Sequence, residues 1–256
     1  MKTIIIIPSR YASVRLPQKP LAIIAGLTMI ERVYRQCKKA SGIDAVYIAT
    51  DHPAIADEAN RFGAGVIMTS PEAPSGTDRV AEAAEKLDLE KENIVINVQG
   101  DEPLIDPVVI TALADEMKNH PEVRVATPIT PLKKVEELTN PNIVFVVKDK
   151  NGNALYFSRH PIPFHRDMGF DSVFSWPEQH LYFKHIGVYA YRAGVLKQFV
   201  ALGESPLERA ERLEQLRLLE AGIPIRCVEV DYESVAVDTS EDIKRVELLI
   251  EVRGIG

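Results

Sequence analysis

Cysteine is scarce in this chain: only Cys37 and Cys227 occur among 256 residues. They form no CxxC pair, which excludes the common zinc spacings and a disulfide-dense scaffold, and isolated thiols fit a reducing compartment. Long hydrophobic runs are also missing. The run Ile4–Ile7 is too short for a signal peptide or a membrane span, and Pro8-Ser9-Arg10 ends it. We therefore expect a cytoplasmic protein without a membrane partner.

An excess of positive charge is absent as well. The formal net charge is −7 at pH 7, and the isoelectric point is about 5.5. Proteins that bind nucleic acid through its phosphates usually carry a broad basic surface, so nucleic acid is not an expected partner. With 46% hydrophobic and 26% charged residues, the chain has the composition of a globular protein with one large α/β domain or a domain with an insertion.

Several motifs of well-known enzyme classes are missing. The chain contains no GxxxxGK[ST] phosphate loop and no HExxH zinc motif. Gly63-Ala64-Gly65 lacks the third glycine of a dinucleotide fingerprint and precedes a predicted strand rather than a helix. The histidines at 160 and 165, and at 180 and 185, are five residues apart, which is not a metal-ligand pattern on a helix.

Strand and helix signals alternate in the first half of the chain. Continuous apolar runs predict buried strands, and capping residues or proline in the first turn predict helix starts. The expected elements are strand Ile4–Ile7, a helix from the Thr28/Glu31 capping box to about Ala40, strand Ala45–Thr50, helix Pro53–Phe62, strand Gly65–Met68, helix Thr77–Leu87, strand Ile94–Gln99 and helix Pro107–Asn119. Alternating units of this size predict an α/β fold with a mostly parallel, doubly wound central sheet.

The second half interrupts this alternation. Val144–Lys148 and Ala154–Phe157 flank Asn151-Gly152 and predict a hairpin. An irregular segment is expected at His160–Gln179. The remaining expected elements are strand Lys184–Tyr191, helices Ala193–Ala201 and Pro206–Glu220, strand Ile225–Val230, and a last helix from the Thr239/Asp242 cap to about Val252. We therefore expect a nucleotide-binding core with an inserted or appended β-rich part.

A loop with three cations follows the first strand. It contains Arg10, Arg15 and Lys19, and no acidic residue occurs before Glu31. In an open α/β sheet the ligand crevice lies at the carboxyl ends of the strands. Cations at that place without local acidic partners favour an anion, and a multiply charged phosphate group suits them. The alternative is a solvated basic loop that pairs with distant acids.

Two acidic residues end strand-like runs. Asp101 follows a predicted buried strand, with Gly100 allowing a close backbone approach, and Asp238 precedes the last predicted helix. Mg²⁺ usually takes one or two carboxylates and completes its shell with phosphate oxygens and water, so Asp101 and Asp238 are candidate metal ligands. The alternatives are an acidic turn closed by Pro103 and a carboxylate that stabilises a helix dipole.

Four polar residues share one face of a predicted helix by their spacing: Glu208, Glu211, Arg212 and Gln215. The simplest interpretation is a salt-bridged surface in which Glu208 pairs with Arg212. A functional role for this face stays open at this point.

Six segments together resemble one family. They are Ile7–Leu21 (IPSRYASVRLPQKPL), Ile96–Pro103 (INVQGDEP), Ala154–Arg159 (ALYFSR), His185–Arg192 (HIGVYAYR), Leu213–Arg217 (LEQLR) and Val237–Asp242 (VDTSED). In this order they resemble the 3-deoxy-manno-octulosonate (Kdo) cytidylyltransferases, or CMP-Kdo synthetases, over nearly the whole chain. The first segment alone is shared more loosely with CMP-sialate synthetases. One position departs from the family pattern, because Gln18 stands where glycine is usual.

The resemblance implies a Rossmann-like nucleotidyltransferase fold with a mostly parallel central sheet flanked by helices. It implies a single domain, residues 1–256, whose nucleotide-binding core covers about 1–130 and 223–256, and whose β-rich sugar-binding and dimerisation part covers about 131–222. It also implies a cytoplasmic homodimer with CTP and Kdo as substrates and Mg²⁺ as cofactor. The product, CMP-Kdo, would serve lipopolysaccharide biosynthesis.

The resemblance also assigns roles to residues. The implied catalytic residues are Arg10, Lys19, Asp101 and Asp238, and the two aspartates would hold Mg²⁺. The implied nucleotide-binding residues are Pro8, Ser9, Arg10, Ser13, Arg15, Lys19, Ser75, Gly76, Arg79, Gln99 and Asp101, with the Ser75-Gly76 backbone reading cytosine. The implied sugar-binding residues are Gln99, Arg159, His185, Tyr189, Glu211 and Gln215, with Arg159 near the sugar carboxylate.

Alternative functions stay open. One is CMP activation of a different sugar acid, either the 8-amino analogue of Kdo or a sialate. Another is a CTP-binding sensor without catalysis, since a fold does not determine a function. A glycosyltransferase would often carry a DxD metal motif, whereas Gly100-Asp101-Glu102 stands at the strand end here.

Overall fold

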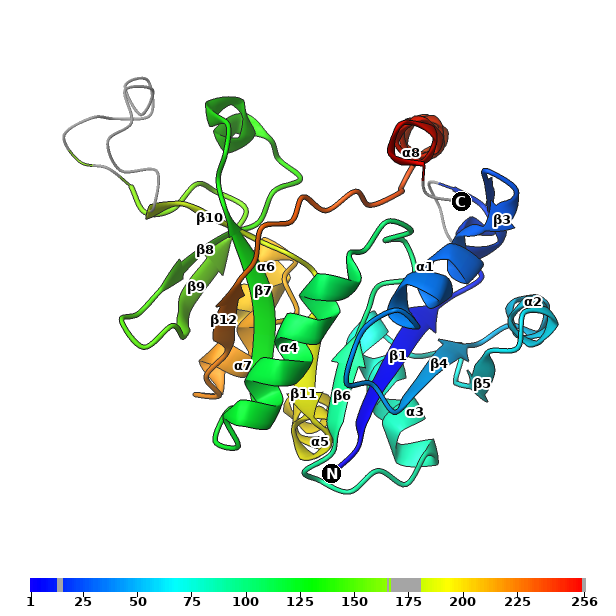
Figure 1. Cartoon of the computed structure of the whole chain (residues 1–256). Coiled ribbons are helices and arrows are strands. Elements are labelled where there is room, and N and C mark those ends of the chain that lie inside the picture. The colour runs from blue at the N-terminus through cyan, green and yellow to red at the C-terminus, as the bar shows by residue number, and fades with distance from the viewer. Residues whose placement is uncertain (13–15, 165, 167–180, 255–256) are drawn as a thin grey trace.

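One twisted sheet runs through the molecule (Figure 1). The computed structural model describes residues 1–12, 16–164, 166 and 181–254. Nine strands of this ten-stranded sheet follow the order β5 (Gly65–Met68), β4 (Ala45–Thr50), β1 (Thr3–Ser9), β6 (Ile94–Asn97), β11 (Tyr189–Arg192), β7 (Val125–Pro131), β10 (Phe183–His185), β8 (Phe145–Lys148) and β9 (Ala154–Ser158), and β12 (Arg226–Glu229) pairs with β7. Strands from both predicted parts of the chain therefore share one sheet.

The sheet is parallel at one side and largely antiparallel at the other. β5, β4, β1 and β6 run parallel, as expected for alternating βα units. β11 is antiparallel to β6 and β7, and β8, β9 and β10 pair in antiparallel fashion, whereas β12 lies parallel to β7. The predicted α/β class with a mostly parallel core flanked by helices is confirmed.

The isoleucine run of β1 explains why helices cover both faces. Successive side chains of a strand point to opposite faces. Ile5 and Ile7 pack among buried residues of α1 (Met29–Cys37), α2 (Pro53–Arg61) and α4 (Pro107–Asn119). Ile4 and Ile6 pack on the other face, where the helices are α3 (Gly76–Lys86), α5 (Ala193–Leu202) and α7 (Leu216–Glu220). Because both faces are covered, the strand is apolar at every position rather than at alternate ones.

Strand β7 is a central strand that the sequence pattern does not predict. No strand was expected between Asn119 and Val144, yet Val125–Pro131 pairs with β10, β11 and β12. The segment contains Pro128 and Pro131, and proline argues against a central strand because it cannot donate to the ladder. Proline nevertheless retains its acceptor: Ile186 N–H donates to the Pro128 carbonyl at 3.0 Å.

Two predicted elements are each divided. The strand expected at Lys184–Tyr191 is two strands, β10 and β11, separated by residues 186–188. β10 pairs with β8, whereas β11 pairs with β6. The two strands therefore have different neighbours on either side of the break. The helix expected at Pro206–Glu220 is α6 (Pro206–Glu211) and α7, because Arg212 has a left-handed backbone with φ of 56°.

Of the two predicted capping boxes, the structure contains one. The Thr239/Asp242 capping box of α8 (Ser240–Arg253) is confirmed. The Thr28/Glu31 box is wrong, although α1 begins there, because the Thr28 hydroxyl donates to Glu58 at 2.7 Å instead of capping the helix. The helices of the described residues include none long and apolar enough to cross a membrane.

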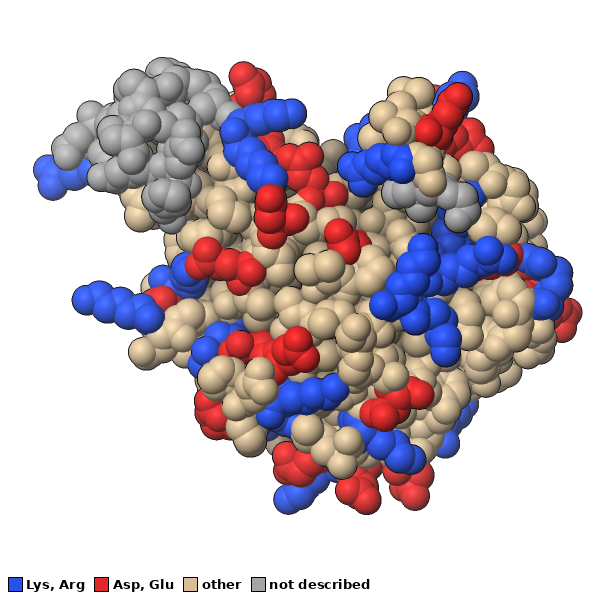
Figure 2. Space-filling view, viewed as in Figure 1, with Lys and Arg blue, Asp and Glu red and all other residues tan. Residues whose placement is uncertain are grey.

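The end of the chain crosses the molecule. After β12 an extended segment passes over the carboxyl ends of the strands and leads to α8, which lies beside the short hairpin β2 (Ile23–Ile24) and β3 (Leu27–Thr28) (Figure 1). This crossing brings Asp238 to the region of the loop that follows β1. Figure 2 shows a notch at this end of the molecule, between the side that carries β8–β10 and the side that carries α8.

Candidate active site

Two adjoining pockets lie at the carboxyl ends of β1 and β6. The smaller one has a volume of about 400 Å³, and its lining includes Pro8, Ser9, Arg10, Lys19, Ser75, Gly76, Arg79, Gln99, Asp101 and Asp238. The larger one has a volume of about 880 Å³ and extends toward β10 and α7. Gln99, Glu214 and Asp238 border both pockets. Of the predicted nucleotide-binding residues, Ser13 and Arg15 lie outside the described residues, and all the others line the smaller pocket.

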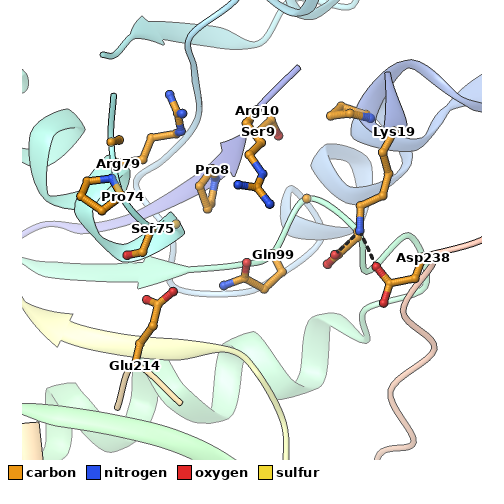
Figure 3. Close-up of a pocket in the computed structure, with 15 residues that line it drawn as sticks. Pro8, Ser9, Arg10, Lys19, Pro74, Ser75, Arg79, Gln99, Glu214 and Asp238 are labelled. Atoms are coloured by element: carbon orange, nitrogen blue, oxygen red, sulfur yellow. Dashed lines mark hydrogen bonds and ion pairs between the residues drawn. The ribbon is translucent and has the colours of Figure 1, made fainter. Parts of the chain in front are cut away.

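Lys19 lies between the two predicted metal ligands (Figure 3). Its Nζ is 2.5 Å from Asp101 Oδ2 and 3.0 Å from Asp238 Oδ1. Burial alone would lower the pKa of Lys19, but the negative charge of Asp101 and hydrogen bonds to both carboxylates outweigh it and raise the pKa. Lys19 is therefore a firmly charged ammonium group that faces the smaller pocket.

Backbone contacts place the two aspartates. Val237 N–H donates to the Asp101 carbonyl at 2.9 Å, so Asp238 is held next to Asp101. The neighbouring Glu102 is buried and accepts hydrogen bonds from Ser234 and, at 3.3 Å, from Tyr232. Burial raises the pKa of Glu102 to about 7. Glu102 thus anchors the segment that precedes Asp238.

The two carboxylates fit a magnesium ion by the chemistry of their donor set. Oxygens of Asp101 and Asp238 converge on one cationic atom, Lys19 Nζ. Two carboxylates, with phosphate and water completing the shell, are what Mg²⁺ usually takes from a protein. No group of three or more His, Cys, Asp or Glu side chains that could hold a metal occurs in the part of the chain that the structure describes.

Gln18 occupies a backbone conformation that favours glycine. Its φ and ψ are 55° and 33°, in the left-handed region. This is the position at which the resemblance would have glycine, and it immediately precedes Lys19. A side chain here costs about 1–2 kcal/mol relative to an ordinary conformation. The departure from the family pattern therefore has an energetic cost at the residue next to Lys19.

The start of α3 forms one wall of the smaller pocket. The Ser75 hydroxyl caps the helix by accepting a hydrogen bond from Asp78 N–H at 3.2 Å. Gly76 lies close to Gln99 and Pro8, since a Cβ there would come within 3.7 Å of both side chains. The Ser75-Gly76 turn is thus within van der Waals reach of Pro8 at the end of β1 and of Gln99 after β6.

Glu214 is a site residue that the sequence reasoning missed. It borders both pockets and stands in the LEQLR segment directly before Gln215, a predicted sugar-binding residue. Burial raises the pKa of Glu214, and the hydroxyls of Thr77 and Ser75 only partly offset this effect. Figure 3 shows its carboxylate between Ser75 and Gln99. The LEQLR motif could have indicated Glu214. The spacing expected of an unbroken helix indicated Glu211 instead.

The larger pocket contains four of the predicted sugar-binding residues: Gln99, His185, Tyr189 and Gln215. Among the described residues, Gln215 Nε2 and Thr130 Oγ1 are buried there without a hydrogen-bond partner. Buried polar atoms are normally paired, because an unpaired one costs about 1–3 kcal/mol. The wall of this pocket is therefore polar and suits a ligand with several hydroxyl groups.

His185 lies in the wall of this pocket. Its Nε2 is 3.0 Å from Thr127 Oγ1, and the Thr127 hydroxyl also donates to the Val188 carbonyl at 2.8 Å. Burial lowers the pKa of His185 to about 3, which keeps the ring neutral. The ring also lies 5.1 Å from Phe157 and 5.2 Å from Tyr189, measured between ring centroids.

Arg159 and Glu211 lie together, outside the lining of these two pockets, but Arg159 lines a third pocket of about 310 Å³ that shares Asn140 with the larger one. Glu211 accepts hydrogen bonds from the Ser158 hydroxyl at 2.8 Å and from Arg159 N–H at 2.9 Å. Arg159 Nε donates to the Glu211 carbonyl at 2.8 Å. Neither residue is among the described ones that line the two large pockets.

The predicted salt bridge between Glu208 and Arg212 is wrong. Glu208 pairs with Arg217 at 2.7 Å, and both side chains are buried. The helix ends at Glu211 and the left-handed Arg212 turns the chain, so residues four apart no longer share a face. This turn is what places Glu214 and Gln215 at the pocket.

Comparison with known proteins gives a consistent result. The cytidylyltransferase family model matches residues 4–235. The 3-deoxy-manno-octulosonate cytidylyltransferase 2 of Actinobacillus pleuropneumoniae serotype 5b is 48% identical over 251 residues, covering 98% of this chain and 99% of that protein. The 3-deoxy-manno-octulosonate cytidylyltransferase of Syntrophotalea carbinolica is 49% identical over 242 residues, covering 94% and 96%.

Solved structures agree with these relatives. A CMP:2-keto-3-deoxy-manno-octonic acid synthetase complexed with CTP has a TM-score of 0.89 and 41% identity, covering 99% of this chain and 100% of that one. A 4-diphosphocytidyl-2C-methyl-D-erythritol synthase has a TM-score of 0.64 with 13% identity, which shows a shared fold alone.

Proposed function

Because the chain belongs to the cytidylyltransferase family, and within it to the 3-deoxy-manno-octulosonate cytidylyltransferases, we propose that it transfers CMP from CTP to Kdo and releases pyrophosphate. The observation that carries this proposal is the junction of two pockets. Gln99, Glu214 and Asp238 border both of them, and Lys19 lies at the junction. Two substrates bound side by side would meet there.

The smaller pocket suits the nucleotide. Arg10 and Lys19 would donate hydrogen bonds to the triphosphate, and the Ser75-Gly76 turn would take the cytosine. The larger pocket suits the sugar acid, whose hydroxyl groups would pair with Gln215, Thr130 and His185. Arg159 remains a proposed partner of the sugar carboxylate, although it would have to leave its contacts with Glu211.

The chemistry then consists of one displacement. The oxygen of the anomeric hydroxyl group forms a bond to the α-phosphorus of CTP, the bond from that phosphorus to pyrophosphate breaks, and the hydroxyl proton is released. The protein contributes by holding both reactants in line and by stabilising charge on the phosphate oxygens. Lys19 is the group best placed to do the latter, because it is charged and directed into the junction.

Asp101 and Asp238 would hold the proposed Mg²⁺ cofactor, which when bound polarises phosphate oxygens and makes the attacking hydroxyl more acidic. If Asp101 and Asp238 held the metal, the Lys19 ammonium group would be free to turn to the α-phosphate. The homodimer, the cytoplasmic location and the supply of CMP-Kdo to lipopolysaccharide biosynthesis remain proposals that rest on family membership.

The test is pyrophosphate release from CTP and Mg²⁺ with one sugar acid supplied at a time. Release with Kdo, and not with its 8-amino analogue or N-acetylneuraminate, supports the proposed reaction and substrate. Release with another sugar acid alone would change the substrate and keep the reaction. Binding of CTP without pyrophosphate release from any mixture would favour a CTP sensor.

A further inference from the structure

A network of polar contacts joins three strand-end loops to helix α3. Its centre is Asp51, the residue that follows β4. Asp51 Oδ1 accepts a hydrogen bond from Tyr11 N–H at 3.2 Å, and Asp51 Oδ2 faces Arg79 Nη2 at 3.1 Å. One carboxylate thus contacts both the loop after β1 and the helix that begins at Gly76.

Arg79 extends this network to the loop after β5. Its Nη1 donates to Thr69 Oγ1 at 2.5 Å and to the Ser70 carbonyl at 3.3 Å. The exposed fractions of the Arg79 and Asp51 side chains are 4% and 12%. Solvent therefore screens this ion pair little. In Figure 3 the Arg79 guanidinium points away from Gln99 and Glu214, although Arg79 lines the pocket.

The loop after β1 is held at a second point. The rings of Tyr11 and His52 are stacked, with centroids 3.7 Å apart and planes 11° apart. Tyr11 directly follows Arg10. Arg79 lies one turn into α3, and its backbone N–H donates to the Ser75 carbonyl at 3.2 Å. The network therefore connects the neighbour of a phosphate-binding arginine with the turn at the opposite wall of the smaller pocket.

We propose that Asp51 and Arg79 are positioning residues that set the distance between the Arg10 loop and the Ser75-Gly76 turn, so that Arg79 acts on CTP through this contact rather than by touching it. The proposal rests on the proposed function of the smaller pocket. A buried ion pair with directional hydrogen bonds on both sides restricts the two loops. Small displacements of such positioning groups cost large factors in binding and rate.

The test uses the full chain with three variants, Asp51→Asn, Arg79→Ala and the double variant, and Asp57→Asn as a control at an exposed aspartate on α2. The readouts are the Kd of CTP alone by calorimetry, the KM values of CTP and Kdo, kcat and the thermal midpoint. We expect the Kd of CTP to rise about tenfold in each single variant. The KM of Kdo should change less than about twofold, because the network contacts the nucleotide side of the site.

The double variant gives the sharpest result. Both substitutions break the same connection. The Kd of CTP for the double variant should therefore be no higher than the higher of the two single-variant values. If Arg79 instead contacts CTP directly, Arg79→Ala weakens binding while Asp51→Asn, which frees the guanidinium, does not, or the two losses add. Either pattern overturns the proposal.

A purely structural role would also overturn it. In that case the KM of CTP and the KM of Kdo would rise together as the thermal midpoint falls. If Asp51→Asn does not fold, Asp51→Glu keeps the charge and moves it by one methylene, and it should show the same selective loss of CTP affinity. Inactivity of the wild-type chain would argue against the proposed function, whereas an active wild type without the selective pattern would argue against this positioning role alone.

Discussion

The backbone N–H of Val237 donates a hydrogen bond to the carbonyl oxygen of Asp101 at 2.9 Å. Together with the contacts of Glu102 to Tyr232 and Ser234, this hydrogen bond holds the segment before α8 at the carboxyl end of β6 and places Asp238 beside Asp101. Lys19, from a third segment, then joins the two carboxylates. The charged centre of the site is thus assembled from three segments that are far apart in the sequence.

Replacement of Lys19 by alanine should lower kcat for pyrophosphate release by about 10²–10³, the usual scale for one preorganised donor to developing charge. The control is Lys150→Ala, which removes an exposed lysine in a turn. Turnover at the wild-type level in the Lys19 variant would contradict the proposed role.

The double variant Asp101→Asn/Asp238→Asn should lose magnesium-dependent activity, because amides cannot supply the charge that attracts the cation. Pyrophosphate release is measured as a function of Mg²⁺ concentration, with each single variant alongside. A double variant whose rate still rises with Mg²⁺ over the wild-type range would refute the pairing of these ligands.

Gly100→Ala should reduce kcat/KM for CTP by about 10- to 100-fold. A Cβ at this position would lie 2.8 Å from Ser9 Oγ and 3.0 Å from the Pro8 carbonyl, so the end of β1 must shift, and misplacement on this scale is costly. Ser9→Ala/Gly100→Ala removes one of the two clashes and should recover part of the loss. Unchanged kinetics in Gly100→Ala would show that the close approach is not required.

Gln18→Gly should raise the free energy of unfolding by about 0.5–1 kcal/mol. Glycine removes the cost of the left-handed conformation at φ 55°, and its own loss of chain entropy offsets part of that gain. Gln18→Ala is the matched control, because alanine keeps the Cβ and should give no such gain. Denaturant unfolding of the three proteins measures the difference.

His185 should make the protein less stable as the pH falls below 6.5. The unfolded chain has an ordinary histidine pKa near 6.5, whereas burial lowers the pKa of His185 to about 3 in the folded state. The unfolded state therefore binds the extra proton between these values. The contribution to stability is complete above pH 6.5 and is lost progressively toward pH 3, by about 2 kcal/mol between pH 7 and pH 5.

Urea unfolding at several pH values tests this effect. His185→Gln retains a hydrogen-bonding partner for Thr127 and should be less sensitive to pH than the wild type. His120→Gln, at a histidine with 46% of its side chain exposed, should resemble the wild type. Parallel pH curves for wild type and His185→Gln would contradict the assignment.

Most elements of the parallel half follow from local patterns. The β-branched run at Ile4–Ile7 and the capped, proline-led helices are signals that neighbouring residues carry, and strands β4 and β5 and helix α4 have the predicted bounds. Strand β7 could not be predicted in this way. Its prolines disfavour a strand locally, and the strand is stabilised by pairing with β10, β11 and β12 and by packing against α4.

The candidate site also contains residues that local patterns predict and one that they do not. Arg10, Lys19, Asp101 and Asp238 follow from strand ends and from charge without local partners, and the structure places them at one pocket. Glu214 escaped notice because helical periodicity assumed an unbroken helix through Arg212. The helix instead breaks at the left-handed Arg212, and Glu208 pairs with Arg217 beyond the break, which spacing along the chain does not reveal.

The sequence by itself therefore determined the α/β class, the cations of the loop after β1 and the two carboxylates that end strand-like runs, since these depend on backbone preferences and on charge. The tertiary structure alone decided that Lys19 lies between those carboxylates, that Glu214 borders both pockets and that Arg79 faces Asp51. Each of these relationships depends on contacts between distant segments, and their energies arise only when burial removes the groups from water.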